Sequence, residues 1–157
     1  MARRYDDAIV QFRKVLRMAP DLPFAHFVLS VIFFHKAMYE ESLAEMKGAY
    51  NSTGDREVEE ALTQGYAQSG YRGAMRRAAD LLAARFRENV NPLNLNASDI
   101  ATLYVMAGDE AHGLAWLERG LEVRDPNMPS IRLFPPFETL RNTPRFQTIS
   151  RRMNLPR

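Results

Sequence analysis

The sequence predicts an all-α fold in which short antiparallel helix pairs stack side by side, an α-solenoid. Apolar residues recur at three- and four-residue steps along most of the chain, and short turns interrupt them. In three places an aromatic residue stands four positions before a small hinge residue: Phe33 before Ala37, Tyr66 before Gly70, and Tyr104 before Gly108. Successive hinges lie 33 and 38 residues apart, a period typical of helical repeats.

Residues 23–54 contain the clearest pair, hinged at Ala37-Met38. Its first helix is apolar on most sides, which predicts a place inside the stack. Its second helix, from Tyr39, has one apolar stripe and one charged side. An isolated helix shorter than about 12–15 residues is marginal in water, so both helices should depend on their neighbours.

The remaining helices are predicted from apolar stripes and from their end signals. Asp55 and Asp109 are expected N-caps, and Gly70 should end its helix in a left-handed conformation. The expected ranges are Tyr5–Met18, Asp55–Gly70, Tyr71–Glu88, a helix marked by Ile100, Leu103 and Tyr104 that ends at Gly108, and Asp109–Arg124.

Composition limits the class of protein. A chain of 157 residues, 46% hydrophobic and 25% charged, suits one domain with a sizeable core. No apolar run reaches the roughly 18–20 uncharged residues of a membrane span, and the N-terminal sequence lacks the pattern of a signal peptide. The chain has no cysteine, which excludes disulfides and thiolate metal sites and fits a reducing compartment. We therefore expect a cytoplasmic protein.

No pattern in the sequence predicts catalysis. The three histidines lack the spacing of metal ligands, and phosphate-loop, dinucleotide-binding and nucleophile-elbow motifs are missing. The acidic group Glu57, Glu59 and Glu60 is explained by the positive end of a helix dipole. We therefore expect no catalytic residue, no metal and no cofactor.

The repeated pattern resembles the tetratricopeptide repeat, a helix-pair motif with aromatic and small residues at fixed places. The matching residues are Leu29, Ser30, Phe33, Ala37, Tyr39, Ser42 and Met46 in one copy, Leu62, Thr63, Tyr66, Gly70 and Met75 in the next, and Ile100, Ala101, Tyr104, Gly108, Gly113 and Leu117 in a third, while Ala8, Phe12 and Pro20 match half of an earlier copy. The chain departs from the family at Met75, where a small residue is usual, and at His26 and Ala97, which stand near the usual tryptophan.

The resemblance implies a right-handed superhelical stack within one domain. Its parts would be a half repeat at residues 1–22, repeats at 23–55, 56–93 and 94–127, and a proline-rich capping segment at 128–157. Phe137 and Leu140, then Phe146, Ile149 and Met153, predict two short apolar helical faces in the cap, which should cover Leu114 and Leu121.

The C-terminal part is also similar to the repeat region that ends many bacterial multidomain regulators. The residues that carry this similarity are Trp116–Glu118, Arg124–Pro126, Pro136-Phe137, Leu140-Arg141, Pro144–Phe146 and Met153–Pro156. It implies a bacterial protein whose repeats serve a larger regulatory protein or complex.

In the repeat family the first helices line a concave groove that binds a protein or peptide. By register the groove residues would be Phe27, Val31, Phe34 and His35 in the first full copy, Glu60, Gln64 and Gln68 in the second, and Thr102, Val105 and Met106 in the third. The branch that clamps a terminal carboxylate uses Lys, Asn and Arg at such places, and this chain lacks them, so a peptide with apolar anchors suits better. In an open alternative, Phe27, Val31 and Phe34 belong to the core, because a helix that is apolar all round is usually buried.

Two further expectations concern the ends of the chain. Residues 124–157 hold seven arginines against Asp125 and Glu138, so an alternative function is contact with nucleic acid or another anionic surface through Arg141, Arg145, Arg151 and Arg152. At the other end, Ala8, Phe12 and Val15 would face water in a monomer. They predict an upstream segment or a homo-oligomer that pairs through the half repeat.

Overall fold

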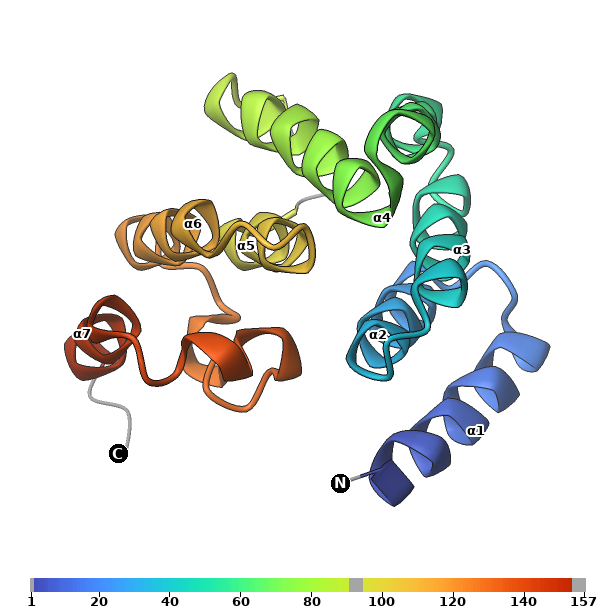
Figure 1. The fold of residues 1–157 in the computed structure, drawn as a ribbon, viewed down its shortest axis with the longest axis horizontal. Helices are drawn as coiled ribbons and strands as arrows, with labels where there is room; N and C mark the ends of the chain where they lie inside the picture. The colour runs from blue at the N-terminus through green and yellow to red at the C-terminus, as the bar shows by residue number, and fades with distance from the viewer. Residues whose placement is uncertain (1, 91–94, 154–157) are drawn as a thin grey trace.

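The computed structural model describes residues 2–90 and 95–153, and these residues form helices and turns with no strand, which confirms the all-α prediction (Figure 1). The elements are α1 (Ala2–Met18), α2 (Pro23–His35), α3 (Tyr39–Asn51), α4 (Arg56–Arg87), α5 (Ala97–Met106), α6 (Glu110–Glu122), the 3₁₀ helices η1 (Met128–Ser130) and η2 (Pro135–Leu140), and α7 (Pro144–Arg152). None of these helices is long and apolar enough to cross a bilayer.

Consecutive helices are neighbours in space. Helix α2 packs against α1 and α3, α4 packs against α3 and α5, and α5 packs against α6. The helices follow an arc, and the chain after α6 returns toward α2, so that η2 contacts both α2 and α5 (Figure 1). We call the side of α2 and α5 that faces η2 the inner wall.

The hinges repeat one backbone feature. Ala37, Gly70 and Gly108 have φ angles of 56°, 67° and 79°, a region that glycine adopts more readily than other residues. The expected N-caps also form, because the carboxylates of Asp55 and Asp109 accept hydrogen bonds from the N–H groups of Val58 and His112 at 3.3 and 3.0 Å. These three hinges and two N-caps were therefore predicted from local chemistry.

Helix α4 is bent where the sequence predicts two helices. Ser69 and Gly70 leave helical geometry, and the two halves fold against each other at Gly65 and Gly73. A Cβ atom on Gly65 would lie 2.4 Å from the carbonyl oxygen of Gly73, and one on Gly73 would lie 2.5 Å from that of Gly65. Only glycine at both places allows the two backbones to approach this closely.

Buried serines join the first pair to α4. The Ser30 hydroxyl donates to the Ser42 carbonyl, and the Ser42 hydroxyl to the Ser30 carbonyl, each at 2.7 Å. The Ser42 hydroxyl also lies 2.8 Å from the hydroxyl of Tyr71 in the second half of α4. Because these hydroxyl and carbonyl groups satisfy one another's hydrogen bonds, the two serines can be buried where α2 and α3 meet α4.

Helix α1 is longer and better covered than expected. It begins at Ala2 rather than at the predicted Tyr5. Ala8 and Phe12 pack against a small core around Ile9, Leu29, Ile32 and Phe33. The expectation that they face water is therefore corrected, although Val15 remains 37% exposed.

The C-terminal segment, residues 128–153, forms the two expected apolar faces but places them on different partners. Phe146 and Ile149 of α7 are buried, and α7 packs against α6, as a cap would. In contrast, η2 lies against α2 and α5, with Phe137 and Leu140 both fully buried. The segment therefore covers the inner wall as well as the last helix.

Candidate functional site

The predicted groove residues divide into three groups. Val31, Thr102, Val105 and Met106 are buried, with 1–6% of their surface exposed. Phe27, Phe34 and His35 are half-buried, whereas Glu60, Gln64 and Gln68 are exposed. Val31, Val105 and Met106 share one continuous core with Phe137 and Leu140. In this conformation η2 of the same chain occupies the inner wall. Val31 is therefore a core residue, as the alternative interpretation of the sequence expected.

His35 stands at the edge of this covered wall. Its ring stacks on Tyr5 of α1 with centroids 5.8 Å apart, and its Nε2 atom is buried without a hydrogen-bond partner among the described residues. Burial lowers the pKa of His35, against the opposing effect of the nearby Glu138 carboxylate. The imidazole is therefore a packing group between α1, α2 and η2.

The exposed predicted residues lie apart from the apolar ones. Glu60 and Gln64 line a shallow polar hollow of about 340 Å³ along the first half of α4, and the side-chain oxygen of Gln68 accepts a hydrogen bond from Arg77 at 3.2 Å. None of the residues around this hollow lines the apolar cleft described next. The structure thus does not bring the ten predicted positions together into one surface.

An apolar cleft opens beside η2, with a volume of about 540 Å³. Phe24, Phe27 and Val28 of α2 form one wall, and Ile131, Phe134 and Phe137 of the C-terminal segment face them; Asn96, Ser98, Asp99, Asn127 and Ser130 supply its polar atoms. A second hollow of about 310 Å³ shares Phe24, Phe27 and Asp99 with it. Phe24 is 65% exposed. Among the predicted site residues, only Phe27 lines this cleft.

Among the described residues that line the cleft, Asp99 is the one with an ionisable side chain. It belongs to a capping box in which its carboxylate accepts a hydrogen bond from the Asn96 N–H at 2.9 Å. Burial raises the pKa of Asp99 to about 6, the nearby Asp125 carboxylate adds to this rise, and the Asn96 N–H opposes it. Asp125 itself is held by the N–H groups of Ser98 and Asn127 at 2.7 and 2.8 Å. Two carboxylates therefore lie beneath an aromatic cleft.

Asp99 should make the folded protein less stable as the pH rises. An unfolded carboxyl group titrates near pH 4, whereas the folded pKa is about 6. The folded state thus holds the proton more tightly, and stability falls as the pH rises through about 4–6. We expect Asp99→Asn to match the wild type at pH 4 and to exceed its free energy of unfolding by about 2–3 kcal/mol at pH 8. Urea unfolding of both proteins at both pH values measures this, and a variant that is less stable at pH 8 would contradict the assignment.

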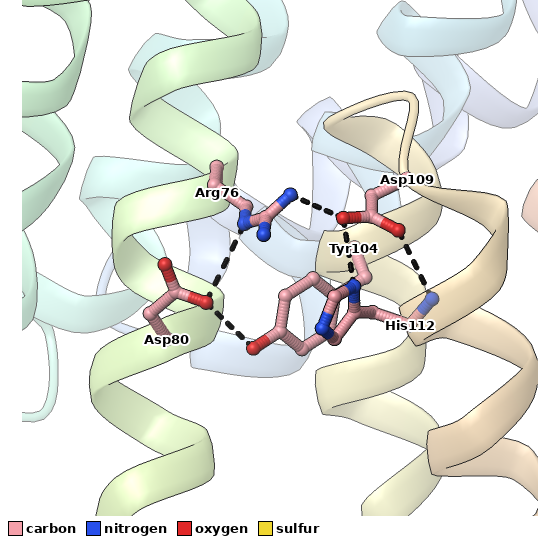
Figure 2. A network of polar contacts seen from close by, with 5 residues as sticks. All are labelled: Arg76, Asp80, Tyr104, Asp109 and His112. Carbon is pink, nitrogen blue, oxygen red and sulfur yellow. Dashed lines mark hydrogen bonds and ion pairs between the residues drawn. The ribbon is translucent and has the colours of Figure 1, made fainter.

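A second polar group joins the second half of α4 to α5 and α6 (Figure 2). The buried Tyr104 donates its hydroxyl to Asp80 at 2.7 Å, Arg76 pairs with both Asp80 and Asp109, and the ring of His112 lies 2.9 Å from Asp109. Partial burial disfavours the charge on Asp109, but its bonds to His112 and the nearby Arg76 give it a lowered pKa.

These residue types also occur in active sites, yet here each functional group is paired with another of the set (Figure 2). Burial raises the pKa of Tyr104, so its hydroxyl stays protonated. These paired side chains join neighbouring helix pairs, and we call the group the Tyr104 clasp. Two of its members, the repeat aromatic Tyr104 and the N-cap Asp109, were singled out from the sequence.

Within residues 2–90 and 95–153, no cluster of three or more His, Asp or Glu side chains is placed to hold a metal ion. His26 instead bridges Glu45 and the Pro20 carbonyl, at 2.6 and 2.9 Å. Comparisons of the chain with protein families, with curated proteins and with solved structures found no match.

Proposed function

We propose that the protein is a non-catalytic interaction scaffold, built as a tetratricopeptide-like stack, that binds a protein or peptide partner. The sequential packing of α2 to α6 and the recurrent positive-φ hinges support the repeat interpretation. The paired state of the Tyr104 clasp argues against a catalytic use of its side chains. A role within a larger regulatory protein or complex remains part of this proposal.

The apolar cleft is the observation that carries the proposal. Its volume of about 540 Å³ lies in the range of pockets that hold small ligands or the anchor side chains of a peptide. Phe24 is 65% exposed, and large exposed aromatic residues beside a concavity are typical of interaction sites. We propose that a partner inserts an apolar side chain between Phe27 and Phe134 and places a cationic group near Asp99.

This cleft replaces the broad concave groove as the proposed binding surface. The inner wall is filled by Phe137 and Leu140, whereas Phe24 is accessible to a partner without any rearrangement. A cation next to Asp99 would favour its ionised form, so binding should tighten as the pH rises through about 6.

Selection from a random peptide library on the immobilised protein tests this function. Selected peptides should share an apolar anchor beside a Lys or Arg, and Phe24→Lys should weaken their binding by at least about tenfold, measured by fluorescence polarisation. Val10→Lys is a matched control, because Val10 is also exposed, at 60%, but lies on α1. Peptides that bind the Phe24→Lys protein as well as the wild type would refute the cleft.

A further inference from the structure

A separate hollow lies between the end of η2 and α7, with a volume of about 490 Å³. It shares no lining residue with the apolar cleft. The residues around it are Arg132, Arg141, Asn142, Phe146, Gln147, Ser150 and Arg151. Gln147, Ser150 and Arg151 follow one another at helical spacing on one side of α7. Three guanidinium groups and two side-chain amides therefore surround one concavity.

The ionisable side chains that line this hollow are all arginines. Its lining contains no acidic side chain among the described residues, and the nearest partner of Arg141, Glu138, lies 4.0 Å away. Arg151 contacts the hydroxyl of Thr148 at 3.0 Å rather than a carboxylate. An anion entering the hollow would meet guanidinium groups that are well suited to oxyanions.

The other two arginines of α7, Arg145 and Arg152, interact with Glu118 of α6 instead. Arg145 makes two hydrogen bonds to the Glu118 carboxylate of α6, at 3.0 and 2.8 Å. The pKa of Glu118 is lowered chiefly by Arg145 and further by Arg152. The four arginines that the sequence groups together are thus divided, because Arg141 and Arg151 line the hollow while Arg145 and Arg152 serve the contact between α6 and α7.

Two buried polar atoms around the hollow lack partners. Arg141 Nε and Ser150 Oγ have no hydrogen-bond partner among the described residues, and only 4% of Ser150 is exposed. Leaving such a group unsatisfied costs about 1–3 kcal/mol, and folded proteins rarely do so. A ligand with several acceptor oxygens that reached both atoms would satisfy them and neutralise the Arg141 and Arg151 guanidinium groups at once.

We infer that this hollow binds a small molecule that carries a phosphate group, held by Arg141, Arg151 and Ser150. A phosphate accepts bidentate bonds from guanidinium and single bonds from hydroxyl and amide donors. The concave shape and the volume of about 490 Å³ suit a soluble ligand of nucleotide size or below. A membrane surface or a nucleic-acid strand would instead be met by an extended basic face.

Titration calorimetry with inorganic pyrophosphate as the probe tests the site. We expect saturable binding with one site per chain, weakened by at least about tenfold in Arg151→Gln and in Arg141→Gln. Arg152→Gln is the matched control on the same helix and should bind as the wild type does. Equal losses in Arg151→Gln and Arg152→Gln, or no saturable binding by the wild type, would overturn the inference.

Arg141 is half-buried, so a loss of binding in its variant has to be distinguished from a loss of structure. Gln147→Glu avoids this difficulty, because it places a carboxylate at an exposed position of the same lining. It should abolish pyrophosphate binding while circular dichroism and the thermal midpoint stay unchanged; binding that persists in this variant would refute the site.

Two further probes separate the possible sources of phosphate. Vesicles that contain anionic lipid, and mixed-sequence DNA and RNA, are tested with the same variants. The inference expects pyrophosphate to compete with any binding that depends on Arg151. Binding to vesicles or nucleic acid that depends equally on Arg152 and is insensitive to pyrophosphate would replace the pocket with a general basic surface.

Discussion

Replacing Phe137 by alanine is expected to lower the free energy of unfolding by about 4 kcal/mol. The Phe137 side chain is fully buried and belongs to the main core, and η2, which carries it, packs against both α2 and α5. Its removal takes away apolar contacts and leaves a cavity between elements that are far apart in sequence. Urea unfolding followed by circular dichroism measures the change.

Leu133→Ala provides the control for Phe137→Ala. Leu133 lies four residues earlier in the same segment but is 83% exposed, so its truncation should change stability by less than about 0.5 kcal/mol. If both substitutions cost the same small amount, η2 does not pack on the inner wall in solution. The contrast therefore tests the placement of the segment as well as the size of the effect.

Gly65→Ala is expected to destabilise the protein by about 3 kcal/mol, at the upper end of the usual cost of overpacking. The added Cβ would meet backbone atoms, the Gly73 carbonyl oxygen at 2.4 Å and the Ala74 Cα at 2.8 Å. Backbone atoms cannot rotate away as a side chain can, so the two halves of α4 must separate. The free energy of unfolding in urea and the thermal midpoint both report this change.

Gly48→Ala makes the same substitution inside a different helix. There the three atoms nearest to the new Cβ all belong to the His26 ring, the closest at 3.0 Å, and alanine favours a helix over glycine by about 1 kcal/mol. We expect a net change below about 1 kcal/mol in either direction. A Gly65→Ala protein as stable as the Gly48→Ala protein would show that the two halves of α4 are not in backbone contact.

The sequence predicted those parts of the fold that depend on local chemistry. The hinges at Ala37, Gly70 and Gly108 and the caps at Asp55 and Asp109 are set by residues within one helical turn of each other. The structure has both caps and a positive φ at each hinge. At Gly70, however, ψ is −156°, so this residue bends α4 without adopting the predicted left-handed helical conformation. The start of α1 was wrong by three residues, an ordinary error for a helix terminus without a strong cap.

The parts that could not be predicted depend on contacts between distant residues. The close approach of Gly65 and Gly73 follows from how the two halves of α4 cross. Thr102 and Met106 were predicted to line a groove, but they are buried. The position of η2 along the inner wall cannot be read from the periodicity of the sequence. The Asn96–Asp99 capping box is readable in the sequence, but the burial that perturbs Asp99 comes from the rest of the fold.

Coverage of the inner wall by η2 has a consequence for any ligand that would use that wall. The covering segment is tethered to the same chain through α6 and η1, and tethered groups reach an effective concentration of about a millimolar when the linker is short. An external segment of similar affinity would have to exceed that concentration to compete. Weak ligands therefore reach only the surfaces that η2 leaves free.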